Sequence, residues 1–344
     1  MKTFYSAAHL AHDPGMEFEA GRLSPAVEIP ARAERILAEI GTRKLGAVLT
    51  PKMFADELIS RVHDAGLIAF LEDAHRSWLE RYGQDAPNAI PSAWPARGMK
   101  PRGRDGDVET QLGTYSFDTA TPIMKGTWRA ARDAVNVALS AADSVLNGDR
   151  AAFGLTRPPG HHAGGDIFGG YCYLNNVAIA AQWLADQGKR VAILDVDYHH
   201  GNGTQSIFYA RSEVLFVSVH ADPAFAFPHF LGFADETGEA AGEGANLNIP
   251  LGKGTDWASY AVALGHGISR VRAFGPDVLL VSLGLDTFED DPIARFALKR
   301  IDYFRLGEAI ASARLPTVFL FEGGYNIDAL GEITVNVLEG FEAQ

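Results

Sequence analysis

The chain has 344 residues, a length that at about 150 residues per domain permits either two domains or one large α/β domain. Hydrophobic residues make up 47% and charged residues 21%, which argues against a disordered or fibrous protein. The 43 acidic and 30 basic side chains give a net charge of −13, which argues against nucleic-acid binding and favours cationic ligands. Neither a secretion signal nor an apolar run of about 18 residues is recognisable, so we expect a cytoplasmic protein with no membrane partner.

Cys172 is the only cysteine. One cysteine can form neither an internal disulfide nor a thiolate cage, so any metal has to bind through nitrogen and oxygen atoms. We interpret Cys172 as a packed wall residue rather than as a nucleophile.

Short β-rich segments recur along the chain, at residues 46–50, 152–155, 191–196, 214–219, 278–283 and 317–321. Most are apolar on both faces, which is typical of a parallel sheet covered by helices on both sides. Helical patterns occupy residues 126–146, 175–187, 257–274 and 302–313, with Gly188 and Gly275 where two of them should end. We therefore predict one α/β domain over residues 1–344, with a central, mostly parallel sheet of about eight strands flanked by helices.

The segment at about 82–115 has no clean periodicity. It contains four prolines, at 87, 91, 95 and 101, and a basic run at 97–104. Ordered loops of this length are uncommon in a compact domain and are usually functional or disordered. The segment is therefore either a flexible surface excursion or an inserted loop that forms an active-site rim, a subunit contact or both.

Titratable residues beside glycines follow four of the predicted strands, in segments 157–163, 197–203, 284–288 and 322–325. The carboxyl ends of parallel strands meet at one edge of a sheet, where ligands bind. We expect these four segments to form one site.

Two carboxylates and an imidazole in these segments have the composition of a metal site. Extended backbone would place Asp195, Asp197 and His199 on one side of the chain, and Asp286 would join them from another strand end. Asp197, His199 and Asp286 would give a three-ligand site open to water and substrate. Zinc suits that set, although Fe²⁺, Co²⁺ and Mn²⁺ are also permitted. An Asp-x-His pair alone would more often have no metal.

A water activated by such a metal needs a base, and a polarised carbonyl needs a second electrophile. His161 and His162 could supply the base, although a histidine pair after Pro-Pro-Gly could also belong to a capped turn. Tyr325 follows two glycines and could donate its hydroxyl to an oxyanion, although a lone tyrosine is more often a core residue. The set indicates metal-assisted amide hydrolysis.

The motifs in these segments resemble those of a known superfamily. They are Arg-Pro-Pro-Gly-His-His (157–162), Gly-Gly-Tyr-Cys-Tyr-Leu-Asn-Asn (169–176), Asp-Val-Asp-Tyr-His-His-Gly-Asn-Gly-Thr-Gln (195–205), Leu-Gly-Leu-Asp-Thr-Phe (283–288) and Glu-Gly-Gly-Tyr (322–325). In order and spacing they resemble the zinc-dependent histone deacetylase and acetylpolyamine amidohydrolase families of the arginase–deacetylase superfamily. The segment 92–128 is most similar to the acetylpolyamine amidohydrolases. The resemblance covers essentially the whole chain and implies the arginase–deacetylase fold.

The resemblance also implies roles for individual residues. It makes Asp197, His199 and Asp286 the zinc ligands, His161 and His162 the tandem histidines, and Tyr325 the electrophile. Tyr171, Phe227 and Gly170 would line a substrate tunnel, although the two aromatic residues could also be ordinary core. A structural potassium ion would be held by Asp195, Asp197, His199, Ser218 and the carbonyl of Val219. Asp195 would have a second role as the partner of His161.

Three further positions indicate which members of the superfamily the chain resembles. Asn202 stands where class I histone deacetylases have aspartate and where acetylpolyamine amidohydrolases have asparagine. An asparagine adds no negative charge, so we expect His162 to be neutral more easily and available as general base. Gly201 and Phe288 stand where arginases have metal ligands, so we expect one transition metal and no guanidine hydrolysis.

By resemblance, Glu17 and Glu109 fall where this group offers carboxylates to polyamine ammonium groups, although both could simply be solvated. Ala120 stands where a further acidic residue can occur. The predicted function is metal-dependent removal of acetyl groups from small-molecule acetylated polyamines, by a homodimer formed through the 82–115 loop. The alternatives are a protein acetyl-lysine deacetylase, a related small-molecule acylamide deacylase, and an inactive metal-binding or acyl-lysine-binding module.

Overall fold

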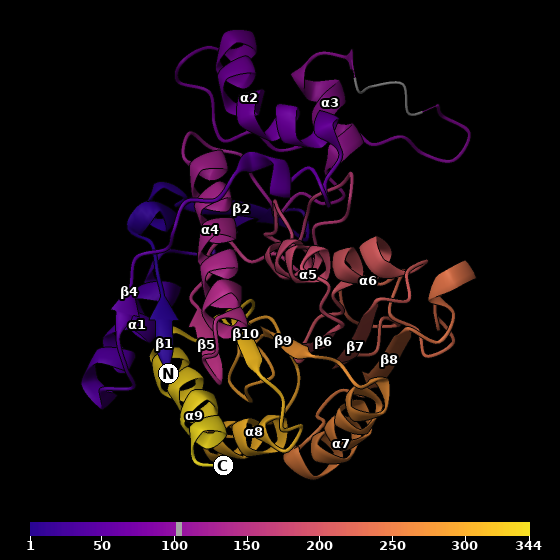
Figure 1. Cartoon of the computed structure of the whole chain (residues 1–344). Coiled ribbons are helices and arrows are strands. Elements are labelled where there is room, and N and C mark those ends of the chain that lie inside the picture. Colours follow the sequence, from indigo (N-terminus) through magenta and orange to yellow (C-terminus); the bar gives the residue numbers. More distant parts are fainter. Residues whose placement is uncertain (101–104) are drawn as a thin grey trace.

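The computed structural model of the chain describes residues 1–100 and 105–344. Its centre is an eight-stranded sheet in the order β4-β1-β5-β10-β9-β6-β7-β8, in which every neighbouring pair is parallel (Figure 1). The strands are β1 (Lys2–Phe4), β4 (Val48–Leu49), β5 (Ala151–Gly154), β6 (Val191–Asp195), β7 (Val214–Ala221), β8 (Asn246–Leu251), β9 (Val278–Leu283) and β10 (Thr317–Phe321). The predicted α/β class and sheet are confirmed.

The inner strands are buried over their whole length, as their two-sided apolar sequences predict. The strand predicted at residues 46–50 shortens to β4, whose two residues are exposed at the sheet edge. Two strands of this central sheet lie outside the predicted segments. β1 has only three residues, and β8 interrupts its apolar residues with Asn246 and Asn248, whose side chains are buried.

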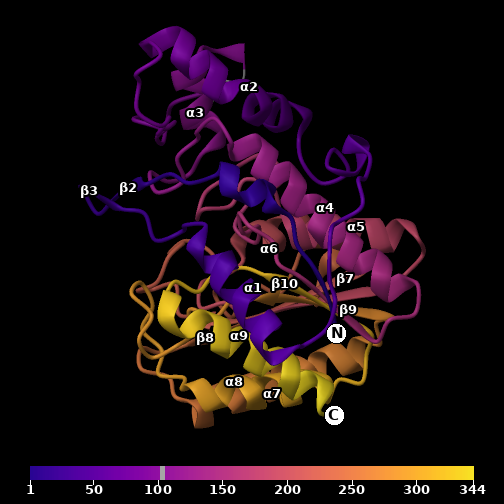
Figure 2. The same cartoon turned by 90° about the vertical axis from the view of Figure 1, so that its left-hand side faces the viewer.

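Helices cover both faces of the sheet (Figure 2). On one face lie α1 (Ala31–Arg43), α7 (Trp257–Phe274), α8 (Arg300–Ala311) and α9 (Ile327–Glu342), and on the other lie α4 (Thr127–Leu146), α5 (Asn176–Asp186) and α6 (Asn202–Phe208). Asp256 caps the first turn of α7, and Gly275 ends it in the left-handed conformation with φ +66°. Two apolar cores, one on each face, hold the helices to the sheet.

A lobe outside the sheet contains α2 (Ala65–Tyr82) and α3 (Val108–Tyr115), and a third apolar core packs it against α4 and α5 (Figure 1). The prediction of an aperiodic segment at 82–115 is wrong for its last eight residues, which form α3. Asp107 accepts a hydrogen bond from the Thr110 amide and caps this helix, while Leu112 and Tyr115 are buried in the lobe. Residues 101–104 of the predicted loop lie outside the described residues.

A short hairpin of β2 (Met16–Glu19) and β3 (Arg22–Pro25) extends beside the lobe, as Figure 2 shows. The loops that leave the carboxyl ends of β5, β6, β7, β9 and β10 carry the predicted site residues. Among the described helices, none combines the length and the apolar character needed to cross a membrane.

Candidate active site

Three predicted metal ligands lie together at neighbouring strand ends. Asp197 and His199 follow β6, and Asp286 follows β9, which pairs with β6. All three are buried, and their ligand atoms lie within 4.8 Å of one another. His199 Nδ1 is 3.0 Å from Asp286 Oδ2 and 3.4 Å from Asp197 Oδ1. Two carboxylates and one imidazole at these distances fit a divalent transition metal with open coordination positions.

Backbone amides hold the two carboxylates in place. The amides of His199 and Gly323 donate to the two oxygens of Asp197 at 2.9 and 2.8 Å, and the Tyr198 amide donates to Asp286 at 2.9 Å. Gly323 is required by this approach, because a Cβ there would lie 2.5 Å from oxygens of both Asp197 and Asp286. The site is therefore preformed by loops at three strand ends.

The buried charges shift the pKa values of the candidate ligands. Burial and the negative charge of Asp197 raise the pKa of Asp286 to about 7. Burial alone would lower the pKa of His199, but hydrogen bonds to Asp197 and Asp286 raise it to about 10. These raised pKa values favour the protonated forms of His199 and Asp286. A metal ion would therefore compete with protons for both side chains.

The tandem histidines follow β5 and have different partners. His161 Nδ1 is 3.0 Å from Asp195 Oδ2, and His162 Nδ1 is 2.7 Å from Asn202 Oδ1. Burial lowers the pKa of His161, but Asp197 and Asp195 outweigh this effect and raise it to about 10. Burial and the positive charges of His161 and His199 hold the pKa of His162 well below its usual value. His162 is therefore neutral, with Nδ1–H donated to Asn202 and Nε2 free to accept a proton.

Tyr325 follows β10 and is buried beside the histidines. Its amide donates to Asp291 at 2.8 Å, and the guanidinium carbon of Arg32 lies 4.5 Å from its ring centroid. Burial raises the pKa of the Tyr325 hydroxyl well above its usual value. The hydroxyl therefore stays protonated and can donate a hydrogen bond.

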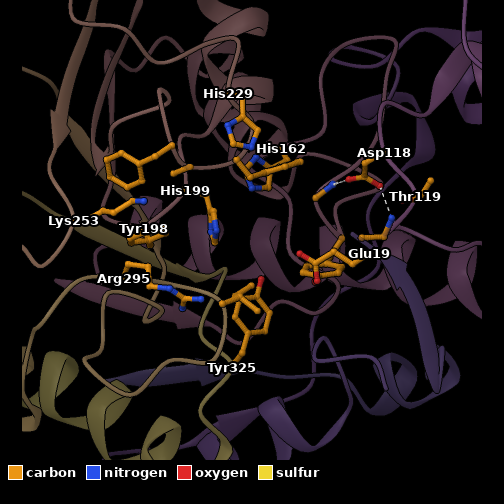
Figure 3. A pocket seen from close by; sticks show the side chains of 17 residues that line it. Glu19, Asp118, Thr119, His162, Tyr198, His199, His229, Lys253, Arg295 and Tyr325 are labelled. Carbon is orange, nitrogen blue, oxygen red and sulfur yellow. Dashed lines mark hydrogen bonds between the residues drawn. The ribbon is translucent and has the colours of Figure 1, made fainter. Parts of the chain in front are cut away.

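A pocket of about 380 Å³ opens above these groups (Figure 3). His162, His199 and Tyr325 face it, and the predicted tunnel residues Tyr171, Phe227 and Gly170 line it. The Phe227 ring stands perpendicular to the His162 ring, with centroids 5.0 Å apart. The other lining residues are Glu19, Asp118, Thr119, Ala120, Tyr198, Phe225, Ala226, His229, Lys253, Ile293 and Arg295.

Residues 26–341 match the model of the histone deacetylase domain. The chain belongs to the histone deacetylase family. It is 49% identical to acetylpolyamine amidohydrolase 1 of Pseudomonas aeruginosa and 46% identical to the acetylpolyamine amidohydrolase of Mycoplana ramosa, with 99% of each chain covered in both comparisons. The crystal structure of acetylpolyamine aminohydrolase from Burkholderia pseudomallei superposes with a TM-score of 0.94 at 39% identity, covering 100% of this chain and 99% of that one.

These findings confirm the predicted family and fold. As a member of the histone deacetylase family the chain is a metal-dependent deacetylase or amidohydrolase, and the cluster of Asp197, His199 and Asp286 is its candidate site for the divalent metal. A second cluster among the described residues, His161, Cys172 and Glu322, is a poorer candidate. Burial and the negative charge of Glu322 raise the pKa of the Cys172 thiol well above its usual value, whereas metals bind the thiolate.

The two rim carboxylates predicted for this deacetylase lie away from the pocket lining. Glu17 is buried and bonded to Tyr171, and burial raises its pKa to about 7. Glu109 lies in the first turn of α3 and lines a separate cavity with Trp94 and Lys100. The carboxylates that do line the pocket are Glu19 and Asp118.

Two residues of the predicted potassium site lie opposite each other on neighbouring strands. Asp195 is the partner of Ser218 in the pairing of β6 with β7. The Ser218 hydroxyl is 2.7 Å from His220 Nδ1, a contact that the sequence did not indicate.

Sequence reasoning missed several pocket residues, namely Tyr198, His229, Lys253, Ile293 and Arg295. Only Tyr198 carried a signal, because it lies inside the metal motif. Lys253 follows β8, a strand that was itself not predicted.

Proposed function

We propose that this chain hydrolyses acetylated polyamines of the acetylputrescine, acetylcadaverine and acetylspermidine class to acetate and a free amine. One observation carries the proposal. Relatives that are 40% to 49% identical over 99% of their length are acetylpolyamine amidohydrolases, and this chain brings the candidate metal ligands Asp197, His199 and Asp286 together at its strand ends.

We propose zinc as the metal held by Asp197, His199 and Asp286, with Fe²⁺, Co²⁺ or Mn²⁺ as alternatives. When bound there, the metal supplies Lewis acidity toward the amide carbonyl and toward water. Side chains of the protein supply the general base and the hydrogen-bond donor to the carbonyl oxygen. His162 Nε2 accepts the proton of the attacking water because Asn202 fixes the other nitrogen as a donor. The Tyr325 hydroxyl donates to the carbonyl oxygen as negative charge develops there.

Proton delivery to the leaving nitrogen completes the reaction. His161 and His162 both qualify as the donor, since their ring centroids are only 4.0 Å apart. Asp195 keeps His161 oriented through the 3.0 Å contact with its Nδ1. The wall of Tyr171 and Phe227 surrounds the aliphatic part of the substrate and keeps water away from it.

Two proposals concern the surroundings of the site. Asp195, Asp197, His199, Ser218 and the carbonyl of Val219 would hold a structural potassium ion. The inserted loop at about 82–115 would form the tunnel rim or a homodimer contact, and Glu109 would then meet the substrate only across that contact, since it lies in a separate cavity on that segment. Glu17 would act through its bond to Tyr171.

A kinetic panel tests the substrate. The protein, loaded with zinc, is assayed on acetylputrescine, acetylcadaverine, acetylspermidine and an acetyl-lysine peptide. We expect a higher kcat/KM on an acetylpolyamine than on the peptide. A higher value on the peptide would identify a protein deacetylase instead, and a zinc-loaded protein that hydrolyses none of these amides would identify an inactive binding module.

A further inference from the structure

The pocket has two walls of opposite charge. In Figure 3, Lys253 and Arg295 lie on one side of His199 and Tyr325, whereas Glu19 and Asp118 lie on the other. An acetylated polyamine carries only positive charge beyond its amide and needs only the acidic wall. The basic wall is therefore unexplained by the proposed function. It is also unexpected from composition, because the chain carries a net charge of −13.

The two cations of the basic wall are available to a ligand. Within residues 1–100 and 105–344, neither Lys253 nor Arg295 forms an ion pair with an acidic side chain. Lys253 Nζ lies 4.8 Å from the ring centroid of Phe225, another lining residue. Arg295 Nη1 donates to the carbonyls of Ala294 at 2.6 Å and Pro292 at 3.4 Å, which holds the guanidinium, while Nε and Nη2 have no hydrogen-bonded partner within the described residues.

The two carboxylates of the acidic wall, Asp118 and Glu19, differ in how firmly they are held. Asp118 is fixed, because it accepts hydrogen bonds from the amides of Gly170 and Ala120. Glu19 lies on the β2–β3 hairpin and is exposed, and within the described part of the chain its carboxylate has no hydrogen-bonded partner. A cationic group at the mouth would therefore meet one fixed and one adaptable carboxylate.

The position of the cations decides which part of the substrate they can meet. The floor of the site is formed by the buried carboxylates Asp197 and Asp286, toward which the amide points. Lys253 and Arg295 are exposed side chains and so belong to the mouth. A negative charge that they recognise would be carried by the amine part of the substrate, at the end remote from the acetyl group.

We propose that the same site also takes acetylated amino acids in which the acetyl group is on the side-chain nitrogen and the α-ammonium and α-carboxylate are both free, as in Nε-acetyl-lysine. The inference rests on the proposed function, because the same groups hydrolyse the same kind of amide. The ammonium faces Glu19 and Asp118, and the carboxylate faces Lys253 and Arg295. Water adds to the acetyl carbon, the C–N bond breaks, and acetate and the free amino acid leave, with the proton passing to the released amine.

Two substrates that differ by one group give a direct test. Acetylcadaverine is Nε-acetyl-lysine without its carboxylate, so their kcat/KM ratio isolates the basic wall. We expect the zinc-loaded protein to hydrolyse Nε-acetyl-lysine with a kcat/KM at least equal to that on acetylcadaverine. We expect the methyl ester of Nε-acetyl-lysine, whose carboxylate is masked, to be a poorer substrate than the free acid.

Variants of the basic wall should change that ratio. Arg295→Gln and Lys253→Gln should each lower the ratio of kcat/KM on Nε-acetyl-lysine to kcat/KM on acetylcadaverine by about threefold or more. Lys125→Gln removes one exposed charge outside the pocket and should leave the ratio unchanged.

The outcomes separate the two proposals. Hydrolysis of acetylcadaverine with little or none of Nε-acetyl-lysine overturns the amino-acid proposal and leaves the polyamine proposal standing. Equal losses on both substrates in the Arg295 and Lys253 variants also overturn it, because the wall would then act on stability or packing. Hydrolysis of neither substrate overturns the proposed function itself and the amino-acid proposal with it.

Discussion

The Glu322 carboxylate accepts a hydrogen bond from the Gly160 amide at 2.6 Å. The same oxygen accepts from the His161 amide at 3.2 Å, so the loop that carries Tyr325 is tied to the loop that carries the tandem histidines. Both partners are buried, and burial raises the pKa of Glu322 to about 7. One buried side chain thus connects the loop of the tandem histidines to the loop of Tyr325.

Removing this tie should misalign the two loops. We expect Glu322→Ala to lower kcat by about tenfold or more with a smaller effect on KM, because a shift of about 1 Å in catalytic groups is costly. Glu322→Gln keeps an acceptor oxygen and should retain most activity. Steady-state kinetics with the metal content measured checks this. Equal kcat for the alanine and glutamine variants would show that the hydrogen bonds do not position the loops.

The partner of His162 should set the acidic limb of the pH–rate profile. Asn202→Asp places a negative charge 2.7 Å from Nδ1 and raises the pKa of His162. A base has to be unprotonated, so the acidic limb of kcat/KM should move to higher pH by about one unit or more. The measurement is kcat/KM against pH for both proteins. An unchanged profile would remove His162 from the role of general base.

The Tyr325 hydroxyl should act mainly in the transition state. We expect Tyr325→Phe to lower kcat by roughly 10²–10³ while metal content and fold are retained. Tyr209→Phe removes a hydroxyl outside the pocket and serves as the matched control. The two variants are compared by kcat and by metal analysis. A Tyr325→Phe variant with wild-type kcat would assign oxyanion stabilisation elsewhere.

Metal binding should be reversible and sensitive to pH. A chelator should abolish activity without unfolding the protein, and zinc should restore it. Because protons and metal compete for His199 and Asp286, whose pKa values are raised, metal affinity should fall as pH is lowered. Asp286→Asn should bind less metal at every pH. Bound metal measured after dialysis at several pH values provides the check.

A buried ionic cluster supports the site from behind. Glu28 accepts hydrogen bonds from Arg32 Nη1 at 2.8 Å and from Arg157 Nε at 2.7 Å, and Arg32 also donates to the carbonyls of Glu322 and Gly324. We expect Glu28→Gln to lower the free energy of unfolding by about 3–5 kcal/mol, because it leaves two buried cations unpaired. Arg76→Gln, at an exposed pair with Asp73, should leave the free energy of unfolding nearly unchanged, because solvent screens this pair.

Urea unfolding experiments give the free energy of unfolding of the Glu28→Gln and Arg76→Gln variants. The same cluster has a pH signature. Burial opposes the charged form of Glu28, but Arg157 and Arg32 outweigh it, and its pKa is lowered in the folded protein. Its stabilising contribution is therefore present above the unfolded-state pKa and is lost as pH falls through the folded-state value. A free energy of unfolding that does not decrease as the pH is lowered would contradict this stabilising role of Glu28.

The sequence predicts what local pattern and motif determine. The helix at 257–274 has the bounds predicted for it because Asp256 caps it and Gly275 ends it. Asp197, His199 and Asp286 converge because parallel strands put their carboxyl ends at one edge. Both inferences need only short-range chemistry and one rule of topology.

What the sequence could not provide depends on long-range packing. β8 keeps its asparagines buried because Asn246 and Asn248 both donate to Gln205, 41 and 43 residues away. Glu17 turns inward to Tyr171, and Lys253 and Arg295 reach one wall from two separate loops. None of these placements has a local signature, so the charge pattern of the pocket emerges only from the folded chain.

His199 and Asp286 are 87 positions apart in the sequence, and they follow strands that become neighbours only when the sheet is assembled. A fragment that ends between β6 and β9 therefore lacks a candidate metal ligand, and the complete site requires these distant segments to pair. Recovery of activity during refolding is for this reason a stringent reporter of the complete native topology.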